Sequence, residues 1–301
     1  MKYNMSSIPA FFTVTLLVVS PVLWFSCDDP EDAFSEESVQ ASNNESTQES
    51  TTDELDDLAR IALASQDPAS GGRISKVTDD RLDCDGTTIT FSNVSTDKSS
   101  GTATINFGAN GCTDNRGNVR KGTVVVEWTG GKWYQEGSVH TITLQNYSIN
   151  GIGIEGNRTL TCFSVSGTLS AFSIQWNITA THNFTWPDNT NGSRIVNKSK
   201  KWDHSASSDV FTISNGPSSE NAAEGTNRHG VSYTMSITTP LVYNASCIQS
   251  NKVFLPVSGV KVFTNVDTGR DVTIDFGDGG CDNTFVVSYE GGSKTVTAKN
   301  D

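Results

Sequence analysis

The side chains of this chain that could carry out acid–base or nucleophilic chemistry are few and scattered. No two histidines have the H-x-x-x-H spacing of a metal site, and no G-x-S-x-G turn or phosphate-binding loop occurs. Asp203 and His204 are adjacent, but no particular serine is singled out as their partner. The sequence therefore predicts no catalytic residue, no cofactor and no enzymatic role. It places all four histidines at polar strand or loop positions: His140, His182, His204 and His229.

The segment DFGDG at residues 275–279 could form either a turn or a cation site. Its glycines suit the positive φ angles of a tight turn, which is the favoured interpretation. The alternative is a calcium site, because carboxylate oxygens are the ligands that Ca²⁺ prefers. The carboxylates of that alternative are Asp275, Asp278 and Asp282.

Aromatic side chains in polar surroundings could stack on the rings of a sugar. Trp133 and Tyr134 follow a Gly-Gly pair, and Trp202 lies in the polar stretch NKSKKWDHS. Trp186 continues an apolar strand pattern, which favours a core position for it. The alternative for the whole set is that the aromatic rings cover the ends of a β-structure. The candidate stacking residues are Trp133, Tyr134, Trp186 and Trp202.

The elements that must position these side chains are β-strands. From residue 72 onward apolar and polar residues alternate, most clearly over 172–180, where the polar positions are Ser, Gln, Asn and Thr. Such alternation is typical of antiparallel sheets with one buried face. An all-β body over 72–301 is expected, arranged as a sandwich or a strongly curved sheet. The same phase continues through Trp186, which is long for one strand, so a bulge or tight turn is expected near His182.

Two segments of the body match each other and suggest a partly duplicated unit. TINFGANGC at 104–112 aligns without a gap with TIDFGDGGC at 273–281, and each copy ends in a cysteine with another cysteine upstream. The economical pairing is Cys84–Cys112 and Cys247–Cys281, although four cysteines allow three connectivities. The body then contains two related units, about 72–165 and 166–301. Cys162 remains, and its apolar neighbours predict a buried thiol.

The net charge of −13 belongs mainly to the N-terminal part of the chain. No Lys or Arg occurs between Lys2 and Arg60, whereas acids are frequent there. Residues 28–52 are too polar to fold, and a short helix is expected over 53–65 because Leu55 and Leu58 recur at helical spacing. The remaining body is nearly neutral and shows no basic stripe, which argues against nucleic acid as a partner.

The first 27 residues are typical of an export signal. Residues 1–26 combine Lys2 with a long apolar stretch, and Ser26-Cys27 resembles the lipobox of bacterial lipoproteins, although Trp24 stands where leucine is usual. The resemblance implies that Cys27 is acylated and that 27–71 is a lipidated acidic tether. A plain signal peptide and an uncleaved anchor are the alternatives. The acids directly after Cys27 resemble the export signal of surface lipoproteins in the Bacteroidetes.

Three segments of the body extend this resemblance. They are NGCTDNRGNVRKGTVVV (110–126), GTNRHGVSYTMSITTPL (225–241) and TIDFGDGGCDN (273–283). Together they resemble flavobacterial-type cell-envelope lipoproteins of the Bacteroidetes, a family without an assigned function. The resemblance implies an outer-membrane or cell-surface location, with the lipid as the link to the membrane. We expect a non-catalytic structural or binding role, with a glycan or an envelope protein as the candidate partner; a carbohydrate-binding or glycan-processing lipoprotein is the alternative.

Overall fold

A computed structural model describes residues 48–49, 52–63, 73–74, 81–82, 84, 86–114, 117–168, 170–247 and 255–297 of the chain. The predicted signal peptide, Cys27 and the predicted tether up to residue 47 lie outside these described residues. The acylation of Cys27 therefore stays a prediction.

Antiparallel β-structure accounts for most of the described chain. The strands are β1 (Arg73–Ile74), β2 (Thr88–Ser92), β3 (Gly101–Thr113), β4 (Val119–Thr129), β5 (Val139–Ile149), β6 (Ile152–Thr168), β7 (Ala171–Thr185), β8 (Asn191–Ser205), β9 (Ser208–Asn215), β10 (Ala223–Thr226), β11 (Ser232–Asn244), β12 (Ser258–Asn265), β13 (Asp271–Asp278), β14 (Thr284–Tyr289) and β15 (Gly292–Thr297). Residues 52–63 form a helix, and residues 245–247 form a single helical turn.

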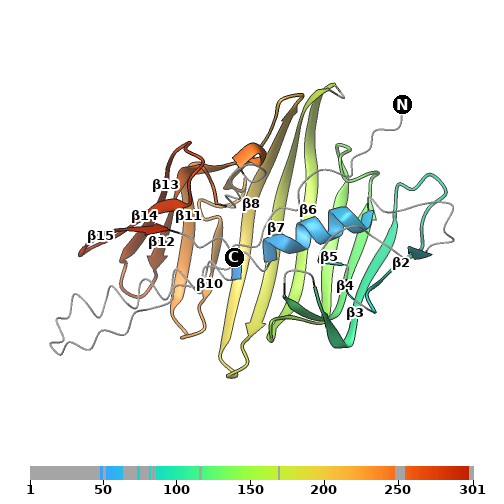
Figure 1. The fold of residues 1–301 in the computed structure, drawn as a ribbon, viewed down its shortest axis with the longest axis horizontal. Coiled ribbons are helices and arrows are strands. Elements are labelled where there is room, and N and C mark those ends of the chain that lie inside the picture. Colours follow the sequence, from blue (N-terminus) through green and yellow to red (C-terminus); the bar gives the residue numbers. More distant parts are fainter. Residues whose placement is uncertain are drawn as a thin grey trace.

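All fifteen strands belong to one sheet in which most neighbours in space are also neighbours in sequence. The exception is the pair β9 and β10, which both lie between β8 and β11: β10 pairs with one end of each long strand and β9 with the other. The strand direction changes progressively from β6–β8 to β12–β15, as Figure 1 shows. A single curved sheet, rather than a sandwich, is thus the arrangement that this sequence adopts.

The longest strands lie at the centre of the sheet. β7 runs through His182 without interruption, and its register with β8 is continuous from Phe172 to Thr185, so the expected bulge near His182 is wrong. The register shift lies instead in β6, between Cys162 and Ser164. The suggested boundary near residue 165 falls inside β6, which pairs with β7 along its length; the division into two units stays a prediction.

One face of the sheet carries the core, as the alternation predicts. Two large hydrophobic clusters lie along it, one built on β2–β7 and the other on β6–β15. The first cluster includes Ile105, Val124 and Ile154, all with no exposed area, and the second includes Met235. We call this buried side of the sheet the inner face. Thr, Ser and Asn dominate the opposite side.

The helix at residues 52–63 lies across the strands on the inner face (Figure 1). Leu55, Leu58 and Ala62 have no exposed area and belong to the first cluster. The predicted helix at 53–65 is therefore confirmed, with ends shifted by one or two residues. The expectation that residues 28–52 do not fold fails at its end, because Gln48 and Glu49 are also helical and Gln48 is buried.

Two disulfides join the cysteines as predicted, Cys84 to Cys112 and Cys247 to Cys281. The matching segments also form the same turn. The side-chain oxygen of Asn106 accepts the N–H of Gly108, and that of Asp275 accepts the N–H of Gly277, each at 2.8 Å. Both glycines have a backbone φ near 80°, a conformation that residues other than glycine rarely adopt.

Candidate functional site

The helix is held on the inner face by buried ion pairs. The acids of this region face a group of cations, most of which come from different strands. These cations are far apart in the sequence, so no basic stripe is visible there. The cations are Arg81, Arg120, Arg158, Arg194, Lys198 and Lys261, and the acids are Glu49, Asp53, Glu54, Asp56, Asp57 and, from β3's end, Asp114. Pairing is what allows so many ionised groups to be buried, because an isolated buried charge is very costly.

Arg120 on β4 links the helix to Asp114, the residue that follows β3. Its two terminal nitrogens donate to the carboxylate of Glu54 at 2.6 and 3.2 Å. Its Nε and Nη2 also donate to Asp114, and Nη1 donates to the hydroxyl of Tyr147 at 3.2 Å. Because the guanidinium plane satisfies three partners at once, it fixes the position of the helix as well as its charge.

Arg158 on β6 forms a bidentate pair with Asp56. It donates from Nε and Nη2 to the two oxygens of Asp56 at 2.5 and 2.7 Å, and from Nη2 to Asp53 at 2.9 Å. Burial raises the pKa of Asp56, and the nearby Arg158 offsets only part of that effect. The pair therefore positions the helix more than it adds net stability.

Glu49 precedes the helix at 52–63 in the sequence and also meets cations of the sheet. Its carboxylate contacts Lys198 on β8 and accepts a bond from Lys261 on β12 at 2.8 Å. Burial would raise the pKa of Glu49, but the surrounding cations outweigh it and hold the pKa well below the ordinary value. Glu49 and the helix at 52–63 thus contact cations on strands that lie far apart along the sheet, β12 and β4.

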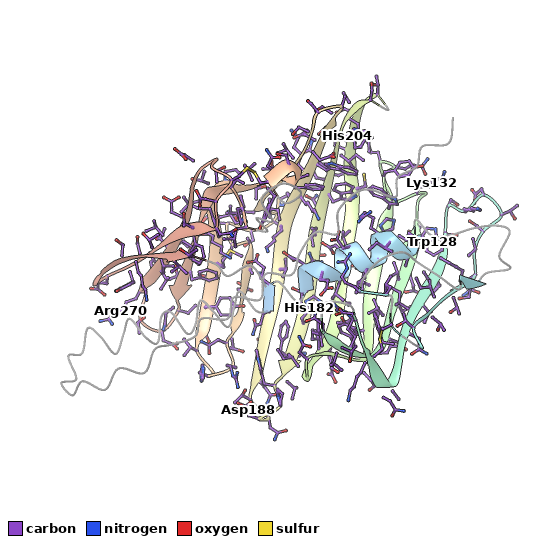
Figure 2. All side chains as sticks on the ribbon, viewed as in Figure 1. Trp128, Lys132, His182, Asp188, His204 and Arg270 are labelled. Carbon is purple, nitrogen blue, oxygen red and sulfur yellow. A yellow bond between two sulfur atoms is a disulfide. The ribbon has the colours of Figure 1, made fainter. Side chains whose placement is uncertain are left out.

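Two of the four histidines are buried on the inner face, which corrects their expected polar positions. His140 on β5 is 5% exposed and His182 on β7 is fully buried. Burial lowers the pKa of His140 to about 4 and that of His182 to about 3, so both imidazoles are neutral at pH 7. Neither ring nitrogen of His182 makes a hydrogen bond within the described residues, nor does Nε2 of His140. Figure 2 shows His182 beside the helix.

A stack of indoles lies next to the C-terminal half of the helix. Trp133, from the loop before β5, stacks on both Trp176 and Trp202 with ring centroids 6.0 Å apart in each case. The Nε1 group of Trp176 donates to the carbonyl of Trp133 at 3.1 Å, and that of Trp202 donates to Asp209 at 2.8 Å. Both bonds hold the rings in place, since an indole N–H is a donor that must be satisfied when buried.

A partly open cavity of about 60 Å³ lies between this stack and the helix. Its walls are mostly apolar, with charged groups from the helix and β8. The lining residues are Asp56, Asp57, Ala59, Arg60, Trp133, His140, Leu160, Trp176, Lys200, Trp202 and Phe211. We call this cavity the indole pocket. Apolar walls with a few convergent polar groups are the usual composition of a small-molecule site.

The structure brings together part of the predicted stacking set. Trp133 and Trp202 both line the indole pocket, and Tyr134 packs edge-on against Trp133 at 5.3 Å. Trp202 is only 3% exposed, although its polar sequence suggested a surface position. Trp186 lies elsewhere: it is buried on the inner face, where Arg228 lies 5.3 Å from its ring.

The separation of Trp186 from the other three follows from the strand geometry. Trp176 lies on β7 and Trp186 directly follows the end of that strand, ten positions further along the chain, which corresponds to about 33 Å of extended backbone. Asp188 is close to Trp186 in the sequence, and His204 is close to Trp202. Figure 2 shows Asp188 and His204 at opposite ends of the long strands. Trp186 therefore cannot share a ligand with the indole pocket.

Sequence reasoning missed several wall residues of the indole pocket. Trp176 belongs to the alternating segment 172–180, whose apolar positions are expected to be buried, and it is 7% exposed; the alternation does not show that it also lines a cavity. His140, Leu160 and Asp56 come from three different elements, and only the tertiary structure brings them to one cavity. The alternation of β5 could have placed His140 on the inner face.

The carboxylates of the DFGDG segment have roles in turns. Asp282 accepts the N–H and the hydroxyl of Thr284 at 2.8 and 2.6 Å, and these bonds lower its pKa. Asp275 caps Gly277, as described above, and Asp278 is exposed. Among the described residues, no group of three His, Cys, Asp or Glu side chains is placed to hold a metal ion.

Comparisons with protein families, with curated proteins and with solved structures each found no match. Within the described part of the chain, no helix has the length and apolar character needed to cross a membrane.

Proposed function

We propose that this chain is a lipid-anchored protein of the outer membrane or cell surface whose β-body has a non-catalytic binding role. The anchor is the acyl group on Cys27, at the junction of the apolar signal and the acids that follow it. The observation that carries the binding role is the indole pocket, a partly open cavity with three indole walls and charged groups at its edge. The resemblance to Bacteroidetes envelope lipoproteins supports the location.

The helix gives this proposal a mechanical basis. The acidic segment after Cys27 precedes the helix in the sequence; the helix is paired with cations on β4, β6 and β8, and Glu49 just before it is paired with Lys261 on β12. A tether that ends in a docked helix holds the body at the membrane by its inner face. The indole pocket, at one side of that helix, then has a fixed position relative to the anchor.

The anchor is tested by labelling cells with radioactive palmitate. Wild-type protein should incorporate label and the Cys27→Ala variant should not; equal labelling of the two would refute the anchor. Protease treatment of intact cells tests the surface location, since a surface protein is degraded while a periplasmic control protein survives.

A carbohydrate ligand is the second candidate, with the body as a carbohydrate-binding or glycan-processing module. It is favoured by Trp133 and Trp202, which share the indole pocket with the carboxylates of Asp56 and Asp57. Flat aromatic walls with hydrogen-bonding groups beside them suit a sugar, which has apolar faces and a polar edge. Intrinsic tryptophan fluorescence over a broad glycan and small-molecule panel tests the binding role, because three of the tryptophans line the pocket.

A further inference from the structure

The size of the indole pocket restricts the group that can enter it. Its volume of about 60 Å³ holds roughly four to five water-sized spheres. A pyranose ring is too large, whereas a planar substituent of a few atoms fits. The rest of the ligand must stay at the mouth, where Arg60, Trp133 and Lys200 are partly exposed.

The chemistry of the walls restricts the group further. Indole rings and Leu160 favour a methyl group, while His140 places an imidazole in the same lining. Its Nε2 atom is buried and makes no hydrogen bond within the described part of the protein. A neutral imidazole nitrogen either accepts an N–H or donates to a carbonyl, depending on the tautomer. The fitting group is therefore small, carries a methyl and has an amide.

We propose that the indole pocket binds the acetamido group of an N-acetylated amino sugar in a glycan. An acetamido group consists of a methyl, a carbonyl and an N–H, which match the indole walls and the imidazole that His140 contributes to the lining. The inference rests on the proposed binding role of the body and names the ligand class for it.

The mouth of the pocket favours a sugar over an acetylated lysine of a peptide. Arg60 and Lys200, both partly exposed, supply donors to the lining, whereas the carboxylates of Asp56 and Asp57 are buried and already paired with arginines. A sugar ring carries several hydroxyl oxygens that can accept from such donors. An acetyl-lysine brings only an aliphatic stem to the same place, and burying a stem beside charges gains nothing.

Two oligosaccharides that differ only in the acetamido group provide the test. The full chain, purified in detergent with its anchor, is titrated with two sugars by calorimetry and tryptophan fluorescence. They are chitotriose, here the trimer of N-acetylglucosamine, and cellotriose, the trimer of glucose. Chitotriose should bind and cellotriose should bind at least about tenfold more weakly, as expected for a lost amide contact. An acetyl-lysine peptide serves as the third probe.

The variants place the effect at the pocket. His140→Leu should weaken chitotriose about tenfold, the equivalent of one hydrogen bond in a closed pocket. Leu160→Phe should abolish binding by filling the cavity without removing a polar group. Trp186→Phe is the matched control, because it changes a distant indole on the same face. Circular dichroism checks that each variant is folded.

Each other outcome overturns the inference. Equal affinity for the two oligosaccharides, tighter binding of the peptide, or unchanged binding in folded His140→Leu and Leu160→Phe proteins would do so. If neither oligosaccharide binds but another compound of the broad panel quenches the indole fluorescence, the acetamido inference fails and the binding role of the body stands. If nothing on that panel binds, the binding role fails as well.

Discussion

Charged residues that are buried on the inner face are each paired with a residue of opposite charge. Arg158 is 1% exposed, and its guanidinium bonds to the carboxylates of Asp56 and Asp53. Taking these groups out of water is expensive, and the attraction between them repays that cost only while all are present. Removing one partner should therefore lower the free energy of unfolding much more than removing both.

We expect Arg158→Met to lower the free energy of unfolding by about 3–5 kcal/mol, because it leaves buried carboxylates without their cation. The double variant Arg158→Met with Asp56→Leu should recover most of this loss. Urea denaturation followed by circular dichroism measures both. The exposed pair Lys201–Asp203 is the control, and removing it should change stability by less than about 1 kcal/mol. A double variant as unstable as the single one would contradict the account.

The two buried histidines predict a pH dependence of stability. Burial lowers the pKa of His140 to about 4 and of His182 to about 3, below the value near 6.5 of the unfolded chain. Between these values the unfolded state binds protons that the folded state does not. Each histidine therefore lowers the free energy of unfolding by about 1.4 kcal/mol per unit as pH falls below 6.5.

The measurement is urea denaturation at a series of pH values from 7 down to about 4.5. Replacing both histidines, with His140→Leu and His182→Leu, should flatten the slope. Replacing the exposed His229 with glutamine controls for the loss of an imidazole as such. A slope that is unchanged in the double variant would show that other groups cause it.

At the scale of the element, the helix at 52–63 combines two kinds of contact. One side packs Leu55 and Leu58 into the first hydrophobic cluster, and the acids on neighbouring positions meet the cations of the sheet. The apolar contacts supply the free energy of docking, because burial of aliphatic side chains is favourable without any matching cost of charge desolvation. The ion pairs set the register and direction of the helix.

Truncating a buried leucine of the helix tests this division. Leu55→Ala should cost about 2–5 kcal/mol, because it removes a side chain with no exposed area and leaves a cavity. Ile61→Ala, on the same helix but only partly buried, should cost clearly less. Both changes introduce alanine, so differences in helix propensity are small. Equal costs in thermal unfolding would contradict the assigned packing.

At the scale of the whole molecule, the sheet is continuous and the helix spans it. The two disulfides lie in different hydrophobic clusters: Cys112 packs in the first and Cys247 in the second. Arg120, which is paired with the helix, and Lys261, which is paired with Glu49, likewise belong to distant strands. These links predict that the described body unfolds as one cooperative unit.

Removing one disulfide tests the cooperativity. The double variant Cys247→Ser with Cys281→Ser opens a loop of sequence separation 34 and should cost about 3–4 kcal/mol. Unfolding should remain a single transition, with the same midpoint by calorimetry and by proteolysis of sites near β3. Two separate transitions would instead support two independent units.

The all-β fold class and much of the local structure can be predicted from the sequence alone. Alternation along 172–180 predicts one buried face per strand, the matching segments predict both disulfides, and the spacing of Leu55 and Leu58 predicts the helix. These signals are local, or repeat at a fixed period, and the physics that produces them acts within one element. The charge pattern likewise separated an acidic N-terminal part from a nearly neutral body.

Only the tertiary structure decided how these elements meet. Arg120, Arg158, Lys198 and Lys261 look unrelated in sequence, and pairing between strands aligns them under the acids of one helix. The indole pocket arises in the same way, from a loop, a helix and the strands between β5 and β9. Contacts between distant segments depend on the strand register and on the curvature of the sheet. A shift of one residue in the register would move each side chain to the opposite face, and no local sequence pattern encodes these contacts.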